Sequence, residues 1–386
     1  MRKISLLFVI PSLKIGGIEK SLINLLHELD YSKYQVTLFV FNASYLNNIR
    51  IPDPVRIIKG KGILRCMGMT SAEAKESSKI DFAIRSLGSV FCRLLGADFV
   101  YNVLFLFEKK LSGFDYAISY SNNITLRGTY FGTNKYVLQK TMARKKYAWL
   151  HVDYHAMNMD TRVNNREYKM FDGIVCVSNA VKQSFCECNP NLENRCMVIG
   201  NVVHIDKDIE PSKEVDVRKF NIITTGRLDD NKNQIACVKI ARYLKEKGHI
   251  FHWYLVGDGP CAEKIKKAIE ENDLLQNVEL KGYMSRPYSL MKACDLFVST
   301  SKSESYGLAI AESLELGVPV VVNYYPALEE LLPDMCSSNI CFDSHEMCIE
   351  IEKLISSADY YKKLKERTTD VSSTQIVMEK VREAFT

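Results

Sequence analysis

The sequence predicts an α/β protein with two domains, each built on a parallel β-sheet. Its 386 residues suggest two to three domains, and 47% hydrophobic with 25% charged residues is ordinary for a globular protein. Short apolar strands alternate with helical patterns, as in parallel α/β sheets. No window reaches the roughly 20 apolar residues of a membrane span. The twelve cysteines have no metal-ligand spacing and indicate reduced core residues of a cytosolic protein.

The first domain is expected over residues 1–206. It opens with a strand over Ile4–Ile10, a loop with Gly16 and Gly17, and a helix over Ile18–Leu29. A strand, a Gly-Gly loop and a helix can cradle a phosphate, although many α/β folds need glycine there for packing. The opening MRKISLLFVIPSL superficially resembles a signal peptide. Its apolar run is short and no small-residue cleavage site follows, so we expect a buried strand.

Residues 89–110 (SVFCRLLGADFVYNVLFLFEKK) are strongly apolar with charged residues interspersed. We expect buried helices here. The alternative is an amphipathic surface that docks on a membrane, which the cations Arg144, Lys145 and Lys146 beside Trp149 favour. Lys and Arg are in excess in the first domain and Asp and Glu in the second, within a net charge of +5. This suggests an anionic partner, and an anionic membrane fits it at least as well as nucleic acid, for which no motif appears.

The second domain is expected over residues 207–370, beginning with a charged linker. A strand over Phe220–Thr225 leads into a turn with Arg227 and Lys232, two cations that can neutralise a diphosphate. Charges on a turn are otherwise usually solvated. The following Gly-Asp-Gly-Pro at residues 257–260 lacks the full spacing of a dinucleotide fingerprint, so a Rossmann dehydrogenase is not supported.

The most informative stretch is Ser299–Val322, STSKSESYGLAIAESLELGVPVVV. It predicts a loop after a strand, then a helix and a buried strand, and ligands of parallel sheets bind at such loops. Gly307 permits close backbone approach, and the helix N-terminus suits a phosphate. Glu312 lies in a helix that is apolar nearly all round, so its carboxylate must be paired or bind something. The alternative is a helix-start Glu304 and a chance second glutamate.

Seven residues separate Glu304 from Glu312, in the frame E-x-[YF]-G-[LM]-x-x-x-E followed by G-x-P-V-V. This resembles the signature of the family 4 retaining glycosyltransferases of bacterial surface-polysaccharide type, which have the GT-B fold. The H-x-D at His151, GRL-x-x-x-K and G-x-G-P are also similar to motifs of that family. The resemblance covers most of the chain and is weakest between Ser44 and Asp115. It implies two Rossmann-like domains facing across a cleft, with a helix at 371–386 crossing back to the first.

The resemblance implies a retaining hexosyltransferase that moves a sugar from a nucleotide diphosphate sugar, with UDP favoured, to a hydroxyl of a glycan or lipid-linked acceptor. The expected setting is capsule, exopolysaccharide or lipopolysaccharide biosynthesis, in the cytoplasm and peripheral on the inner face of the plasma membrane. No cofactor and no metal are expected, because a cation cluster can stabilise the departing diphosphate and no DxD motif is present. The N-terminal domain would bind the acceptor.

Residue roles also carry over from the resemblance. The catalytic residues would be Glu304, His151, Arg227 and Lys232. Glu304 and His151 would hold the donor sugar. Asn323-Tyr324-Tyr325-Pro326 replaces a Gly-Gly loop of the family, which leaves the phosphate contacts of that loop and the choice of donor open. The donor diphosphate would contact Gly16, Gly17, Arg227, Lys232, Ser305, Tyr306, Gly307 and Leu308, and the nucleoside Glu312, Gly257, Gly259 and Tyr283.

Three other functions remain possible from the residues. Two glutamates could serve a glycosidase, but that chemistry needs facing carboxyl groups, not a loop and the helix that follows it. A nucleotide-sugar epimerase of the same fold would share the diphosphate pocket and need no acceptor. A non-catalytic nucleotide-sugar-binding partner subunit is the third, against which Glu304, Arg227 and Lys232 argue.

Overall fold

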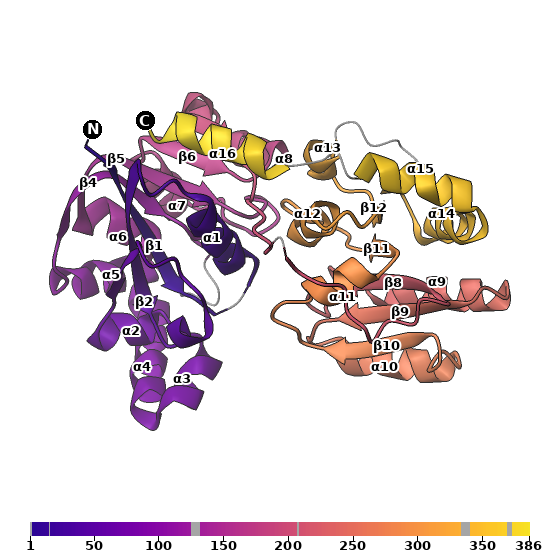
Figure 1. Ribbon diagram of the computed structural model, residues 1–386. Helices are drawn as coiled ribbons and strands as arrows, with labels where there is room; N and C mark the ends of the chain where they lie inside the picture. The colour runs from indigo at the N-terminus through magenta and orange to yellow at the C-terminus, as the bar shows by residue number, and fades with distance from the viewer. Residues whose placement is uncertain (1, 15, 125–131, 207, 333–339, 369–372) are drawn as a thin grey trace. The chain divides into compact units, whose positions relative to one another are not determined.

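The computed structural model describes residues 2–14, 16–124, 132–206, 208–332, 340–368 and 373–386. The chain forms two compact units (Figure 1). The N-terminal unit is Met1–His204 with Ile376–Thr386, and the C-terminal unit is Ile205–Gln375. The sequence predicts this division after residue 206 and the returning helix at 371–386.

The N-terminal unit contains a seven-stranded sheet in the order β3-β2-β1-β4-β5-β6-β7. Each pair of neighbouring strands in this sheet is parallel. The central strands are apolar along nearly their whole length, as expected where helices cover both faces of a parallel sheet. The strands are β1 Ile4–Ser12, β2 Tyr34–Asn42, β3 Arg56–Lys59, β4 Leu111–Ser119, β5 Thr141–Leu150, β6 Gly173–Cys176 and β7 Cys196–Val198.

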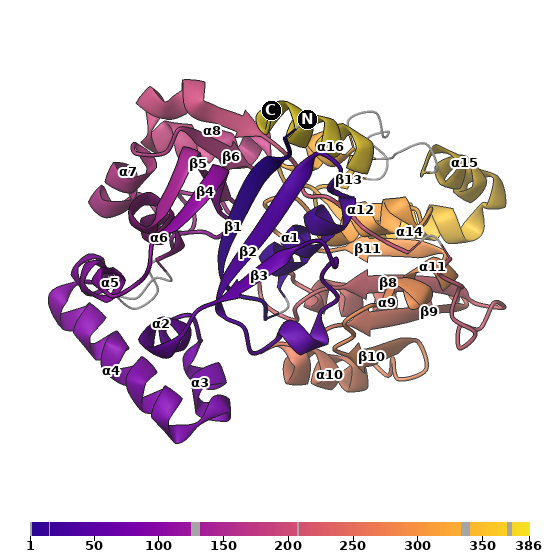
Figure 2. The same cartoon turned by 60° about the vertical axis from the view of Figure 1, so that its left-hand side comes forward.

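Helices connect these strands. Figure 2 shows β1, β2 and β3 side by side, with α4 and α5 at the margin of the unit. The helices are α1 Gly17–Glu28, α2 Gly62–Met67, α3 Ser71–Ser77, α4 Lys79–Leu95, α5 Ala97–Leu106, α6 Thr133–Lys140, α7 Arg162–Tyr168 and α8 Asn179–Cys188, with 3-10 turns η1 Leu46–Asn48 and η2 Pro190–Arg195.

The last helix, α16 (Ser373–Ala384), carries the C-terminus back to the N-terminal unit. The ring of Phe385 lies 5.2 Å from that of Tyr116 and 5.7 Å from that of Tyr147, centroid to centroid. The Tyr34 hydroxyl donates to the Phe385 carbonyl at 3.2 Å. The final residues therefore complete the aromatic core of a unit whose other residues end at His204.

The C-terminal unit contains a six-stranded parallel sheet in the order β10-β9-β8-β11-β12-β13. Its strands are β8 Phe220–Thr225, β9 Phe251–Val256, β10 Val278–Gly282, β11 Leu296–Ser299, β12 Val320–Asn323 and β13 Ile340–Cys341. Its helices are α9 Ile235–Glu246, α10 Ala262–Glu271, α11 Tyr288–Ala293, α12 Leu308–Glu315, α13 Leu328–Leu331, α14 Ser344–Ser356 and α15 Ala358–Thr368.

Both sheets have a topological switch point at their first strand. β1 pairs with β2 on one side and β4 on the other, and β8 pairs with β9 and β11. Loops that leave neighbouring strands at such a point diverge, and ligands of open α/β sheets bind there. The switch point of the C-terminal unit therefore places the loops after β8 and β11 at the expected ligand edge.

Two sequence-based expectations about the N-terminal unit are wrong. Residues 89–110 were expected to be buried helices, yet α4 and α5 leave many large apolar side chains exposed. The segment Trp149–Asp153 (WLHVD) also predicts a strand, but the strand there, β5, begins at Thr141 and ends at Leu150. The basic cluster Arg144–Lys146 therefore lies within β5, whose first half is largely solvent-exposed. No helix among the described residues has the length and hydropathy needed to cross a membrane.

Candidate functional site

Two glycine-containing loops contact each other where β8 and β9 end. The Leu228 amide donates to the Asp258 carbonyl at 3.0 Å, and the Gly226 amide donates to the Val256 carbonyl at 2.9 Å. At Gly257, with φ +150°, a Cβ would lie 1.8 Å from the Gly226 carbonyl oxygen. Only glycine fits this close backbone approach. The loop that carries Gly257 and Gly259 is thereby fixed beside the loop that carries Arg227 and Lys232.

Glu304 and Lys232, both predicted site residues, form an ion pair. Lys232 Nζ donates to Glu304 Oε1, which also accepts from Ser301 Oγ at 2.9 Å. The two side chains are 25% and 18% exposed. The pair is thus open to solvent but held on one side by protein. A carboxylate with two donors on one oxygen is fixed in position, and its second oxygen is available to accept hydrogen bonds.

Backbone contacts tie the loop after β11 to the loop after β8. The Asn231 amide side chain donates to the Ser303 carbonyl at 2.8 Å, and the Lys302 amide donates to the Asn231 carbonyl at 2.8 Å. Thr300 Oγ1 donates to the Lys232 carbonyl at 3.0 Å. Glu304 and Lys232 therefore belong to one rigid assembly at the switch point.

Arg227 lies at the same edge but is held less tightly. Its Nε lies 3.5 Å from Asp229 Oδ2, and the side chain is 71% exposed. An exposed guanidinium with a single weak partner can turn towards an anion at small cost. A cation beside the Lys232–Glu304 pair thus adds positive potential to this edge.

Gly307 shapes the start of α12. It caps the helix with φ +95°, ψ +50°, and its carbonyl accepts from the Ile310 amide at 2.9 Å. A Cβ at Gly307 would lie 2.3 Å from the hydroxyl oxygen of the buried Tyr325. The backbone of Ser305, Tyr306 and Leu308 adjoins it on this loop and helix start, with Tyr306 largely buried and Ser305 and Leu308 partly exposed.

Glu312 is buried on α12, as the apolar surroundings in the sequence indicated. The hydroxyl of Tyr288, at the start of α11, lies 3.4 Å from Glu312 Oε1. Burial and the Glu312 carboxylate both raise the pKa of Tyr288, which therefore stays protonated and serves as a donor. The sequence carried no signal for Tyr288, because its contact depends on how α11 packs beside α12. Tyr283, another predicted nucleoside contact, is exposed on the loop after β10.

The segment Asn323–Pro326, which replaces a glycine-rich loop, contacts the loop that carries Glu304. Asn323 Nδ2 donates to the Ser301 carbonyl at 3.1 Å. Ser301 in turn donates to Glu304. Asn323 is therefore connected to Glu304 through a single residue, and this connection could not be predicted from the sequence.

In the N-terminal unit, Gly16 and Gly17 lie at the start of α1, as predicted. Glu19, in the first turn, is partly buried, and burial raises the pKa of its carboxyl to about 7, with a smaller contribution from Glu73. A carboxyl group that titrates near neutrality at a helix start is a candidate for proton exchange or for hydrogen bonding to a ligand.

His151 directly follows β5 and is buried. Its backbone amide donates to Asn122 Oδ1 at 2.8 Å, and its ring lies 4.6 Å from that of Tyr120. Burial lowers the pKa of His151 to about 3, so the imidazole is neutral. Its Nε2 and the Asn122 amide nitrogen have no hydrogen-bond partner among the described residues. Asp153 of the same H-x-D motif has a structural role, accepting from Ser184 Oγ at 2.6 Å.

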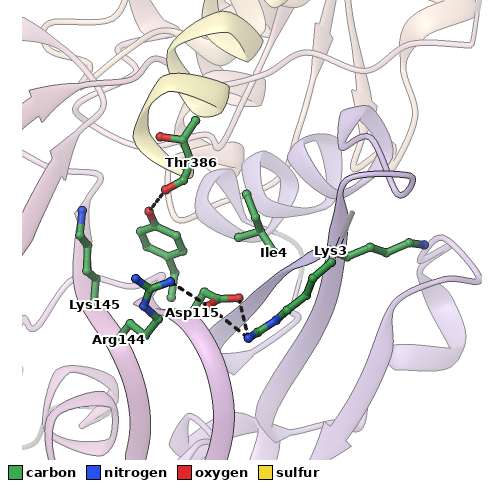
Figure 3. A pocket seen from close by; sticks show the side chains of 8 residues that line it. Lys3, Ile4, Asp115, Arg144, Lys145 and Thr386 are labelled. Carbon is green, nitrogen blue, oxygen red and sulfur yellow. Dashed lines mark hydrogen bonds and ion pairs between the residues drawn. The ribbon is translucent and has the colours of Figure 1, made fainter.

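A basic pocket of about 350 Å³ lies at the amino end of β1, away from the end that carries Gly16 and Gly17 (Figure 3). Arg2, Lys3, Arg144 and Lys145 line it, and Asp115 accepts from Arg2 at 3.3 Å. Arg144 Nη1 lies 3.7 Å from the same carboxylate. The negative charge of Asp115 therefore neutralises part of the positive charge of the side chains that line the pocket.

Comparison with known proteins agrees with this geometry. Residues 206–371 match the family model "Glycosyl transferases group 1". An alpha-monoglucosyldiacylglycerol synthase of Streptococcus pneumoniae is 26% identical over 204 residues, 49% of this chain and 46% of the relative. A poly(ribitol-phosphate) alpha-N-acetylglucosaminyltransferase of Staphylococcus aureus is 25% identical over 256 residues, 61% of this chain and 50% of the relative. The chain thus spans about half the length of these curated relatives.

Solved structures share the fold along the whole chain. Anabaena HepE, crystallised with UDP and glucose, has a TM-score of 0.69 at 17% identity and covers 99% of both chains. A Staphylococcus aureus TarM variant, crystallised with UDP among other ligands, has a TM-score of 0.66 at 13% identity with full coverage of both. The GT-B fold predicted from the sequence is therefore confirmed.

Proposed function

We propose that this chain is a group 1 glycosyltransferase, which moves a sugar from a nucleotide diphosphate sugar, UDP-sugar in the first instance, to a hydroxyl of a glycan or lipid-linked acceptor. The observation that carries the proposal is the Lys232–Glu304 pair at the switch point of the C-terminal unit. The family match over residues 206–371 covers the same residues. UDP in the HepE and TarM crystals supports the choice of donor.

The chemistry follows from charge. Breaking the anomeric bond builds negative charge on the departing diphosphate and positive charge on the sugar. Arg227, Lys232 and the amides at the start of α12 would stabilise the leaving group. The fixed carboxylate of Glu304 would accept hydrogen bonds from the sugar hydroxyls and stabilise the positive charge that develops on the sugar. We propose that no metal is required, because these cations perform the task that a divalent ion performs elsewhere.

Glu312 would accept hydrogen bonds from the ribose hydroxyls, and Tyr288 would orient it. Gly257 and Gly259 would line the nucleoside pocket through their backbone, since neither offers a side chain. The roles proposed for Gly16, Gly17 and His151 towards the donor rest on the resemblance alone. For His151 the orphaned Nε2 adds a reason, because a buried imidazole nitrogen without a partner gains from a ligand hydroxyl.

We also propose that the anomeric configuration is retained. The names of the S. pneumoniae and S. aureus relatives specify alpha products, and the UDP-glucose bound by HepE in another crystal is an alpha-linked donor. We place the reaction in the synthesis of capsule, exopolysaccharide or lipopolysaccharide, at the inner face of the plasma membrane. The acceptor would bind to the N-terminal unit.

The test is product analysis with purified protein. We expect a thermal shift with UDP that does not depend on magnesium, and transfer of a sugar from a UDP-sugar to an added glycan or lipid acceptor, with an alpha linkage detected by NMR. An epimerised nucleotide sugar formed without acceptor would instead indicate the epimerase. Binding of UDP with no product in a broad acceptor screen would indicate a non-catalytic partner subunit, and no UDP binding would refute the proposal.

A further inference from the structure

Helix α4 is amphipathic in the reverse sense to an ordinary surface helix. Its buried stripe contains Asp81, Arg85 and Cys92, whereas its outward face carries large apolar side chains. A surface helix of a soluble protein normally turns its apolar face to the core. The exposed residues include Ile80 at 72% and Leu94 at 74%, together with Leu87, Phe91 and Leu95.

The polar inner stripe of α4 is firmly held by protein partners. Asp81 pairs with Arg65 and accepts from Ser77 Oγ at 2.6 Å. Arg85 Nε donates to the Met69 carbonyl at 2.7 Å. These charged groups fix the orientation of the helix. Its apolar face therefore points outward because the polar face is bound to the protein.

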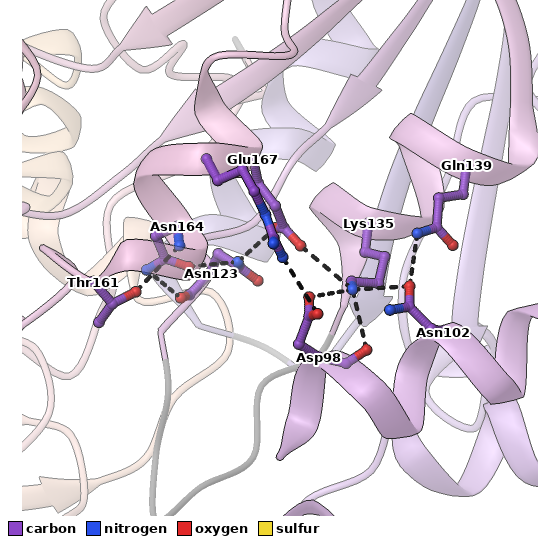
Figure 4. A network of polar contacts seen from close by, with 9 residues as sticks. Asp98, Asn102, Asn123, Lys135, Gln139, Thr161, Asn164 and Glu167 are labelled. Atoms are coloured by element: carbon purple, nitrogen blue, oxygen red, sulfur yellow. Dashed lines mark hydrogen bonds and ion pairs between the residues drawn. The ribbon is translucent and has the colours of Figure 1, made fainter. Parts of the chain in front are cut away.

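Helix α5 differs in that it buries Ala97, Tyr101 and Phe105, but its polar residues are also held by neighbouring helices (Figure 4). Asp98 pairs with the buried Lys135 of α6, whose Nζ also donates to Asn102 Oδ1 at 3.0 Å. Lys135 lies 3.9 Å from Glu167 of α7. The polar side of α5 is thus bound inward by a buried cation.

The outer side of α5 is again apolar and continues into the following turn. Leu106 is 74% and Phe107 84% exposed, and Phe99 and Val103 are also exposed. We call the outward apolar side chains of residues 80–107 the docking face. The docking face extends over two consecutive helices of one unit. It therefore contains more exposed apolar side chains in one segment than the isolated ones that a protein surface normally carries.

The fully exposed charges within the segment of the docking face are cationic. Within residues 79–110, all of which are described, Lys79, Arg93, Lys109 and Lys110 are exposed. Of the three acidic residues, Asp81 and Asp98 are ion-paired. The third, Glu108, is only partly exposed, and burial raises its pKa. The surface is therefore apolar with a cationic border, which complements an anionic partner.

We propose that the docking face lies on an anionic lipid bilayer, with Phe91, Leu94 and Leu106 in the interfacial region and Lys109 and Lys110 at the phosphates. Bulky aliphatic and phenylalanine side chains bordered by lysine and arginine are the composition of interfacial helices. The choice of a bilayer over a protein rests in part on the proposed function, in which the acceptor is lipid-linked. A second copy of the chain would bring the same cations against each other, so the bilayer is favoured.

The experiment is flotation of the full chain with vesicles of phosphatidylcholine, with and without phosphatidylglycerol. We expect binding to the anionic vesicles. Phe91→Ser with Leu94→Ser should lower the partition coefficient by at least about tenfold, because each side chain loses its transfer from water. Lys109→Gln with Lys110→Gln should lower it by about fivefold for each cation on anionic vesicles only.

Matched controls come from the C-terminal unit. Ile250→Ser with Leu275→Ser removes two apolar side chains that are also exposed, and Lys264→Gln with Lys266→Gln removes two exposed cations. Neither should alter flotation. Equal losses in test and control variants, or no flotation of the unaltered chain, would overturn the proposal. A dimer in sedimentation that Phe91→Ser with Leu94→Ser dissociates, without vesicle binding, would identify the face as an interface between copies.

A gain of signal provides a second readout. The only two tryptophans, Trp149 and Trp253, are both buried, so Phe91→Trp adds a reporter on the docking face. Its fluorescence should be quenched by brominated lipid in anionic vesicles, and an unquenched reporter on floated protein would refute insertion. UDP binding is measured on the same samples by thermal shift. If the unaltered chain floats with anionic vesicles but does not bind UDP, the proposed function is refuted and the proposal of membrane binding is not.

Discussion

Gly307 and Tyr325 form a pair whose energetic coupling can be worked out from their geometry. Gly307→Ala would place a methyl group at φ +95° and 2.3 Å from the Tyr325 hydroxyl oxygen. The left-handed backbone costs about 1–2 kcal/mol for a residue with a Cβ. Tyr325 is 1% exposed and cannot swing away, so overpacking adds about 1–3 kcal/mol.

Tyr325→Phe removes the atom responsible for the clash. The next neighbours of the added methyl, Leu331 Cδ1 at 3.1 Å and Ile310 Cδ1 at 3.3 Å, are closer than ordinary van der Waals contacts and need only shift by a few tenths of an ångström. The backbone cost and these small shifts should then remain, so the coupling between the two substitutions should be about 1–3 kcal/mol. Tyr325→Phe by itself should leave stability equal or higher, because the hydroxyl is buried without a partner among the described residues.

The assay is urea unfolding of the C-terminal unit, followed by the fluorescence of the buried Trp253 in a Trp149→Phe chain that silences the N-terminal unit. The double-mutant cycle compares four proteins: the parent, Gly307→Ala, Tyr325→Phe and the double variant. Their free energies of unfolding are compared with one common value for the dependence on urea concentration. A double variant as unstable as the sum of the two single variants would show that the hydroxyl does not occupy the space beside Gly307, and the reasoning would fail.

Three further predictions concern the candidate site. Glu304→Ala should abolish sugar transfer while UDP affinity by calorimetry stays within a few-fold, because its carboxylate is assigned to the sugar; equal loss of both would contradict that role. Arg227→Ala should weaken UDP binding by about tenfold or more through loss of a charge-assisted contact, whereas Arg242→Ala on α9 should not; unchanged affinity would remove Arg227 from the diphosphate site. The raised pKa of Glu19 means that the folded state holds a proton that the unfolded state has released, so stability from this group falls as pH rises from about 4.5 to about 7. Glu19→Gln should flatten that fall in thermal unfolding measured across this range, and an unchanged pH profile would refute the shifted pKa.

The C-terminal unit was largely predictable from the sequence because its strands are short, apolar and bounded by glycine. β8 has the predicted limits, 220–225. The loop with Glu304 and Gly307 and the burial of Glu312 were also identified, since a carboxylate in an apolar helix requires a partner. The partner itself, Tyr288, was not, and neither was the Asn323–Ser301–Glu304 connection. Both depend on tertiary packing.

The N-terminal unit was less predictable for two physical reasons. Periodicity shows that α4 is amphipathic, but it does not show which stripe meets water, and in α4 the polar stripe is buried. The first half of β5 is a polar, exposed segment without the apolar alternation of a strand. Residues 44–80 have no clear pattern, yet they contain β3, α2 and α3.

The return of the chain to the N-terminal unit has a consequence for biosynthesis. The neighbour Phe385 of Tyr116 and Tyr147 comes from residues 376–386, which follow the whole C-terminal unit in the sequence. A ribosome that has finished residues 1–204 has therefore released a unit that still lacks part of its core. The C-terminal unit, Ile205–Gln375, emerges in the meantime and has all of its sheet in one continuous segment. During translation the nascent N-terminal unit therefore keeps an exposed aromatic surface until residues 376–386 have been made and have packed against it.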